Sequence, residues 1–219
     1  MKFYISKVPF NKDVRKIDIK DFLIERGWEL TDKEKALFER ATGGLTKDRP
    51  SKRPDLERGI LLYAFIKRNN LKRALDIGTA GWFSALSMAI AGAWVVTLDV
   101  KPTSPGNWGV FNAYRDRVFQ VVQRSQDYLN NRDSTWDIIF IDGDHFYEAV
   151  KRDCELVKGK FRYLLCHDYG NIGETTKAIN EVLGPPETLI ITDRRWFGAP
   201  YEEKPLSDFD YGIALYEKT

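Results

Sequence analysis

The sequence predicts an α/β protein in which helices cover both faces of a mostly parallel β-sheet. Three observations lead to this fold class. From about residue 72 onward, short apolar segments alternate with segments of helical periodicity. The strand-like segments are almost continuously apolar, which is typical of strands buried on both faces of a sheet. A chain of 219 residues is long enough for one such domain and short for two.

The first third of the chain differs in texture from the rest and predicts helices. Helical spacing runs from Ile17 to Trp28, a capping box at Thr31 and Glu34 begins a second helix, and Pro54 opens a third. We interpret residues 1–70 as an N-terminal helical cap on an α/β core of residues 71–219. Because the cap is too short to form a core of its own, the whole chain, 1–219, is expected to be a single domain.

The basic stretch from Lys47 to Arg58 lies inside this cap. Acidic residues dilute its charge and prolines interrupt it. We interpret it as a solvated loop, and phosphate or nucleic-acid contact is the alternative.

The elements of the core follow in order. Strands are expected at 74–77, 93–98, 118–122, 136–141, 161–166, 188–192 and 211–216. Helices are expected at 82–91, from His145 through Val157, and at 175–183, and Gly184 with Pro185 ends the last of them.

A glycine turn joins the first strand of the core to a helix, and an acid ends the next strand. Gly78 and Gly81 allow a ligand to approach the backbone, and Asp99 lies where a carboxylate can accept both hydroxyls of a ribose. The spacing is not the G-x-G-x-x-G of a dinucleotide site, which disfavours an oxidoreductase. Asp76 beside the turn favours a ligand with positive charge, such as S-adenosylmethionine (SAM), although a turn-capping role for this acid stays open. The predicted cofactor contacts here are Asp76, Gly78, Thr79, Ala80, Gly81, Asp99 and Val100.

Residues 74–81, together with Asp99, resemble the first two motifs of class I SAM-dependent methyltransferases. A second stretch, 140–150, contains Ile-Asp-Gly-Asp-His-x-Tyr and is similar to the small-molecule group that includes sugar O-methyltransferases of macrolide and aminocoumarin biosynthesis. The resemblance implies a Rossmann-like, seven-stranded, mostly parallel sheet with an antiparallel last strand. It also implies contacts to the adenine of SAM after the third strand, where Ser125, Gln126 and Asp127 lie.

Acids and both histidines of the chain follow two neighbouring strands of the core. Asp142 and His145 follow the fourth, and His167 and Asp168 follow the fifth. The carboxyl ends of adjacent parallel strands form the ligand crevice of an open sheet. A divalent ion, Mg²⁺ or Mn²⁺, can be held by Asp142, His167 and Asp168. The resemblance implies two acids at the second position, where this chain has His167, so a structural role for His167 stays open.

His145 is the predicted general base, and Asp142 is the acid expected beside the methyl donor. A histidine titrates near neutrality and can take a hydroxyl proton during methyl transfer. The resemblance places a base three residues after the strand-end acid, as His145 follows Asp142. The alternative for His145 is a structural hydrogen bond. We expect Asp144 to cap a helix that begins at His145.

Net charge and composition indicate which classes of binding partner to expect. The net charge of +2 gives no footprint for nucleic acid, and no apolar segment is long enough for a membrane span or a signal peptide. Cys154 and Cys166 form no Cys-x-x-Cys pair and are expected in the core of a cytoplasmic protein. The expected partner is a small-molecule acceptor, and the sequence allows a homo-oligomer.

The sequence therefore predicts a SAM-dependent methyltransferase that acts on a hydroxyl of a small molecule, with a sugar or polyol as candidate acceptor and a metal as candidate aid. Two other functions stay open. One is a non-catalytic SAM-binding or assembly protein, and the other is an N-methyltransferase that acts on protein or nucleic acid.

Overall fold

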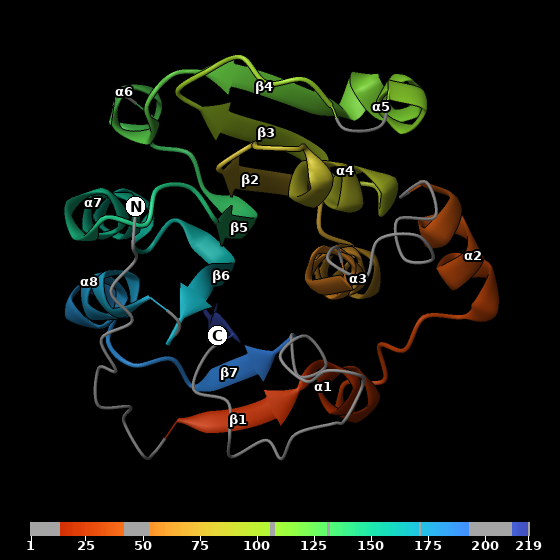
Figure 1. Cartoon of the computed structure of the whole chain (residues 1–219), viewed down its shortest axis with the longest axis horizontal. Helices are drawn as coiled ribbons and strands as arrows, with labels where there is room; N and C mark the ends of the chain where they lie inside the picture. The colour runs from red at the N-terminus through yellow and green to blue at the C-terminus, as the bar shows by residue number, and fades with distance from the viewer. Residues whose placement is uncertain are drawn as a thin grey trace.

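The structure is a computed structural model that describes residues 14–41, 53–105, 108–130, 132–170, 172–192 and 212–218. Its strands form one eight-stranded sheet (Figure 1). They are β1 (Arg15–Asp18), β2 (Arg73–Ile77), β3 (Trp94–Asp99), β4 (Val118–Val122), β5 (Trp136–Ile141), β6 (Phe161–Tyr169), β7 (Thr188–Ile191) and β8 (Gly212–Glu217). The helices are α1 (Ile19–Glu25), α2 (Asp32–Ala41), α3 (Arg53–Asn69), α4 (Phe83–Ile90), α5 (Trp108–Tyr114), the 3₁₀ turn η2 (Arg115–Arg117), α6 (Ser125–Leu129), α7 (Tyr147–Val157) and α8 (Gly173–Leu183).

The strand order is β1-β7-β8-β6-β5-β2-β3-β4. β8 is antiparallel to β6 and β7, and the other neighbouring strands are parallel. The chain runs outward from β2 through β3 to β4, and then returns to the other side of β2 with β5. The strands β2 and β5 therefore flank the point at which the order reverses, where open α/β sheets bind ligands. The predicted Rossmann-like α/β fold with an antiparallel last strand is confirmed.

The sheet has eight strands and not the seven expected, because residues 15–18 add β1 at its edge. β1 runs parallel to β7, with Ile17 opposite Ile190. The helix expected from Ile17 begins instead at Ile19, after Asp18, whose side chain accepts a hydrogen bond from the amide of Lys20 at 2.8 Å. A short apolar segment does not distinguish strand from helix by periodicity alone, and its pairing partner lies far away in sequence. The interpretation of the cap (residues 1–70) and the core (residues 71–219) as one domain stays a prediction.

Two apolar layers hold the sheet between its helices. Figure 1 shows α6, α7 and α8 along one face and α3, α4 and α5 along the other. The side chains of β5 alternate between these layers: Phe140 joins the cluster of α3 and α4, whereas Ile139 joins that of α7 and α8. Cys154 and Cys166 are free, buried thiols, as expected of core residues. The packing holds the carboxyl ends of β2, β5 and β6 together.

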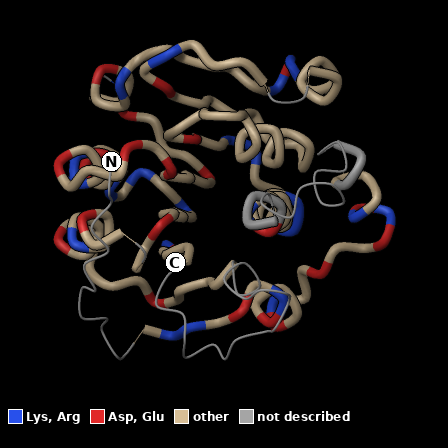
Figure 2. The backbone as a smooth tube through the Cα atoms, in the orientation of Figure 1, with Lys and Arg blue, Asp and Glu red and all other residues tan. Residues whose placement is uncertain are grey.

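Charged residues lie mainly outside these layers. Figure 2 shows Lys and Arg interspersed with Asp and Glu along the helices, while the central strands carry few charges. In the part of the chain that the structure describes, no helix has both the length and the apolar character needed to cross a bilayer.

Candidate functional site

A cavity of about 660 Å³ opens where β2, β3 and β5 end. Its walls come from the glycine turn, the end of β3, the loop before α6, and the segment from β5 into α7. The lining residues are Ile77, Gly78, Ala80, Leu98, Asp99, Val100, Gln123, Arg124, Ser125, Asp142, Gly143, Asp144, Ala149, Arg152 and Asp153. The predicted cofactor contacts divide into two groups. Those in the lining are Gly78, Ala80, Asp99, Val100, Ser125 and Asp142, and those outside it are Asp76, Thr79, Gly81, Gln126 and Asp127.

Gly78 is where the turn after β2 meets the end of β5. Its φ is +107°, and a Cβ atom there would lie 2.2 Å from the carbonyl oxygen of Asp142. Only glycine fits such an approach of two backbones. Gly81 is different, because nothing lies within 4 Å of the position of its Cβ. Ala80 and Trp82 carry the left-handed backbone there, with φ of 38° and 67°.

Asp76 and Thr79 lie beneath the turn and outside the cavity lining. Asp76 is fully buried and accepts a hydrogen bond from Thr97 Oγ1 at 2.7 Å, and Thr79 Oγ1 lies 2.8 Å from the same hydroxyl. Burial raises the pKa of Asp76 to about 7. These two residues support the turn from within.

Asp99 closes the opposite side of the turn. Its Oδ2 accepts a hydrogen bond from the amide of Ala80 at 3.2 Å, and its Oδ1 accepts one from the backbone amide of Lys101 at 3.1 Å. The carboxylate thus ties the end of β3 to the glycine turn at the cavity wall. This is where the sequence places an acceptor for ribose hydroxyls.

The acid that lines the cavity beside the segment after β4 lies on α7 and not in that segment itself. Asp153, on α7, is 5% exposed and accepts a hydrogen bond from Ser125. Burial raises its pKa to about 6. Asp153 lies on the buried stripe of α7 with Val150, Cys154 and Val157. Asp153 was not predicted from the sequence as a cavity residue, although a carboxylate at a core position of an amphipathic helix is a signal for it.

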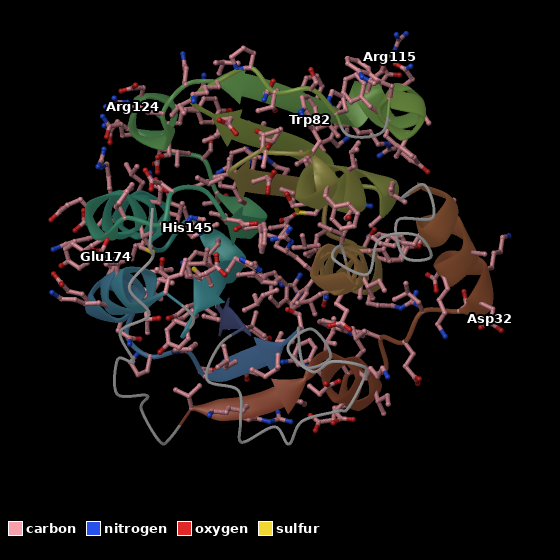
Figure 3. All side chains as sticks on the ribbon, viewed as in Figure 1. Asp32, Trp82, Arg115, Arg124, His145 and Glu174 are labelled. Atoms are coloured by element: carbon pink, nitrogen blue, oxygen red, sulfur yellow. The ribbon has the colours of Figure 1, made fainter. Side chains whose placement is uncertain are left out.

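Beyond Asp142 the cavity wall meets a cluster of two acids and two histidines. His145 Nε2 lies 2.7 Å from Asp168 Oδ2. His167 Nδ1 lies 3.2 Å from Asp142 Oδ1 and 3.2 Å from Asp168 Oδ2. The structure therefore brings together all four residues that the sequence predicted here. Figure 3 shows His145 between the ends of the central strands and the start of α7.

A β-bulge lets β6 supply two consecutive residues to this cluster. Neighbouring side chains on a regular strand point to opposite faces. The pairing of β6 with β8 shifts register between Cys166 and Tyr169, and Asp168 has a φ of +55°. Bulges re-aim side chains beside active sites, and a non-glycine residue with positive φ is strained. The distortion directs both His167 and Asp168 toward Asp142.

The charges of the cluster stabilise one another. The hydrogen bond to Asp168 raises the pKa of His145. Burial opposes ionisation of Asp168 and Asp142, yet His145 and His167 lower the pKa of Asp168, and His167 and Arg58 lower the pKa of Asp142. Burial likewise opposes protonation of His167, but the two carboxylates outweigh it and raise its pKa. The acids are therefore held ionised beside protonated ring nitrogens.

The residues that could hold a metal differ from the predicted set by one member. Asp142, His145 and Asp168 each offer a ligand atom, and these atoms lie within 4.8 Å of one another. His145 thus takes the place expected for His167, whose Nδ1 faces the two carboxylates. That the protein binds an ion stays a prediction.

Arg58 is the cluster residue that the sequence did not predict. Instead of lying in a solvated loop, it is on α3, its side chain is 14% exposed, and its Nη1 lies 2.6 Å from Asp142 Oδ2. The signal was its helical spacing, because Arg58 precedes the buried Leu61 and Phe65 by three and seven residues. Residues 47–52 of the basic stretch lie outside the described part of the chain.

The segment after β5 also begins its helix later than expected. α7 starts at Tyr147, and Asp144 accepts a hydrogen bond from the amide of Phe146 at 3.1 Å. Glu174, from α8, accepts one from the amide of Tyr147 at 3.1 Å (Figure 3 labels it). His145 therefore lies in the loop before α7. Hydrogen bonds at the start of α7, one of them to Glu174 at the start of α8, hold this loop in place.

Comparison with known proteins matches the segment that carries this site. Residues 75–169 match the model of a family described as a methyltransferase domain. These residues contain the whole cavity lining and the two Asp–His pairs, but not Arg58. No curated protein sequence matches the chain.

Several solved structures are similar in fold. They include the SAH-bound methyltransferase PaMTH1 of Podospora anserina, with 22% identity over 74% of this chain and 72% of that one and a TM-score of 0.44. A putative O-methyltransferase from Klebsiella pneumoniae is 15% identical over 75% of this chain and 82% of that one, with a TM-score of 0.47. The Bacillus cereus O-methyltransferase in complex with SAH is 16% identical over the same shares, 75% and 82%, with a TM-score of 0.44.

Because these TM-scores lie below 0.5, we take the fold from the strand order of the sheet itself. The chain thus carries, over residues 75–169, a segment that matches the methyltransferase domain family, set in a Rossmann-like α/β sheet.

Proposed function

We propose that the protein is a SAM-dependent methyltransferase that methylates a hydroxyl of a small molecule of sugar or polyol type. The observation that carries the proposal is the position of Asp142. This residue lines the cavity and also belongs to the cluster that contains His145. A cofactor in the cavity would therefore lie next to a group able to accept a proton.

The cavity has the charge that SAM requires. Carboxylates outnumber guanidinium groups in its lining, which favours a sulfonium and an ammonium group and opposes a pyrophosphate. The four acids are Asp99, Asp142, Asp144 and Asp153, and the two arginines are Arg124 and Arg152. The bare backbone of Gly78 lets a ligand approach the strand end, and Asp99 supports ribose binding.

SAM supplies a methyl group on a positively charged sulfur. When bound, SAM would donate this methyl group to the acceptor oxygen, and the bonding pair would stay on sulfur. His145 takes the hydroxyl proton. Its Nε2 is bound to Asp168, so Nδ1 carries the lone pair of the neutral ring. Asp168 fixes the ring orientation and stabilises the protonated imidazole, as the acid of a catalytic dyad does. Positioning supplies much of the remaining rate enhancement.

Surface charge supports a small acceptor. In the part of the chain that the structure describes, the two signs are mixed along the helices (Figure 2), whereas nucleic-acid binding uses a concentrated basic face. We propose a small-molecule acceptor and neither nucleic acid nor membrane as the partner.

Calorimetry with SAM and with NAD tests the cofactor. Wild type should bind SAM and not NAD, and Asp99→Ala should weaken SAM binding. Asp127→Ala is the matched control, because this nearby acid lies outside the cavity lining. A mass-spectrometric screen of hydroxylated acceptors with SAM then tests the reaction. Binding of NAD but not SAM, or equal loss in both variants, would contradict the proposal.

A further inference from the structure

The cluster beside the cavity contains a permanent positive charge from outside the segment that matches the methyltransferase family. Arg58 reaches it from α3, and its Nη1 lies 2.6 Å from Asp142 Oδ2 and 3.4 Å from His167 Nε2. An arginine side chain stays charged at every physiological pH and can only donate hydrogen bonds. The ring of His167 thus lies between this charge and the two carboxylates, with Nε2 toward Arg58 and Nδ1 toward Asp142 and Asp168.

Packing holds Arg58 in this position. Gly59, the next residue, lies so close to α4 that a Cβ atom there would be 2.5 Å from the ring of Phe83 and 2.7 Å from Ser87 Oγ. α3 can approach α4 this closely because residue 59 has no side chain. The guanidinium is then aimed at the end of β5 and also lies over the ring of Phe140, 5.9 Å from its centroid.

Two carboxylates this close need a compensating cation, since like charges in a buried site disfavour ionisation. A divalent ion is one solution. Here Arg58 and His167 contact the two oxygens of Asp142, and His145 and His167 both contact Oδ2 of Asp168. An ion held by Asp142, His145 and Asp168, whose ligand atoms lie within 4.8 Å of one another, would have to replace these contacts, so it competes with Arg58 for Asp142.

We propose that Arg58 is the resident cation of the cluster, taking the place beside Asp142 that a divalent ion would otherwise fill. Arg58 is thus a positioning residue: it acts through Asp142 and holds that carboxylate at the cavity wall. The role of this site in methyl transfer rests on the proposed function, but the identity of its cation does not.

Mn²⁺ titration of the full chain, followed by electron paramagnetic resonance, tests the proposal. Arg58→Met removes the charge and keeps most of the aliphatic length, and Arg58→Lys keeps the charge. Arg68→Met is the matched control, because Arg68 lies on the same helix and pairs with Glu34 at 2.7 Å, away from the cluster. Melting curves establish that each variant is folded.

Wild type, Arg58→Lys and Arg68→Met should bind no stoichiometric Mn²⁺. Arg58→Met should gain at least about tenfold in Mn²⁺ affinity, because a competing charge has left Asp142. Adding Asp142→Asn to Arg58→Met should abolish that gain.

Either of two results overturns the proposal: no gain in folded Arg58→Met, or stoichiometric Mn²⁺ in wild type that Asp142→Asn removes. The wild-type result decides the matter even where Arg58→Met does not fold. SAM calorimetry on the same samples separates the two ideas, since a wild type that binds no SAM contradicts the proposed function and leaves the Mn²⁺ comparison intact.

Discussion

Among substitutions that add a single methyl group to the glycine turn, Gly78→Ala should disrupt the site most. The new Cβ would lie 2.2 Å from the carbonyl oxygen of Asp142, which is backbone and cannot rotate away. The turn and the end of β5 would have to separate, and the hydrogen bond from the amide of Asp142 to the carbonyl of Ile77, 2.8 Å long, would break.

The cost has two parts. A residue with a Cβ at the φ of +107° of Gly78 is strained by about 1–3 kcal/mol. A lost backbone hydrogen bond adds about 0.5–1.5 kcal/mol. The sum, about 2–4 kcal/mol, should lower the melting temperature by roughly 2–4 °C per kcal/mol for a protein of this size.

Two further variants separate the backbone strain of a positive φ from the steric clash with the carbonyl oxygen of Asp142. Gly92→Ala has nearly the same backbone, with a φ of +114°, but nothing lies within 4 Å of the new Cβ. It should show the strain alone. Gly81→Ala has neither problem and should stay within about 0.5 kcal/mol of wild type. Thermal melts rank the three, and SAM calorimetry should show lost binding for Gly78→Ala only.

The comparison can fail clearly. If Gly78→Ala melts with Gly92→Ala and still binds SAM, the close approach of the two backbones does not shape the cavity. The steric argument would then be wrong.

Three other predictions concern the carboxylates and the base. Asp99→Ala should weaken SAM binding at least about tenfold, since each hydrogen bond to a charged group contributes about 1.5–3 kcal/mol, and unchanged calorimetry would contradict the assignment. His145→Gln should lower turnover by about 10²–10⁴ with little change in SAM affinity. Because Asp168 raises the pKa of His145, the rising limb of the wild-type pH–rate profile should lie above the usual imidazole range and move to lower pH in Asp168→Asn. A His145→Gln protein that keeps turnover but melts early would make the residue structural. Burial raises the pKa of Asp153 to about 6, so the folded state keeps a proton that the unfolded chain loses above about pH 4, and stability falls as pH rises across that window. The stability of Asp153→Asn relative to wild type should therefore improve by up to about 3 kcal/mol between pH 4 and 7 in urea titrations, and an equal difference at both pH values would contradict this.

Local pattern was enough to predict most of the sheet. β4 and β5 have the predicted bounds, 118–122 and 136–141, because each is an apolar segment with one polar residue, flanked by polar residues on both sides. The capping box before α2 is also confirmed, with the amide of Thr31 donating to Glu34 Oε2 at 2.8 Å and the amide of Glu34 donating to Thr31 Oγ1 at 3.3 Å. In these cases the partners are neighbours in sequence.

The rest depends on partners that are far apart in sequence. β1 has four residues and becomes a strand only because β7 offers an edge. Arg58 belongs to the site only because α3 packs beside the end of β5, 84 residues further along the chain. Both Arg58 and Asp153 occupy buried stripes of amphipathic helices, and a charged residue at such a position indicates a distant partner without naming it.

The pairing of β1 with β7 also orders events during synthesis. Arg15 pairs with Thr188, so β1 can complete the edge of the sheet only after the 173 residues from Lys16 to Thr188 have also been made. Contacts between such distant residues carry a large loop-closure cost and form slowly. β1 thus leaves the ribosome well before β7 and is among the last strands that can find their place in the sheet, and until then its apolar side chains lack their native cover.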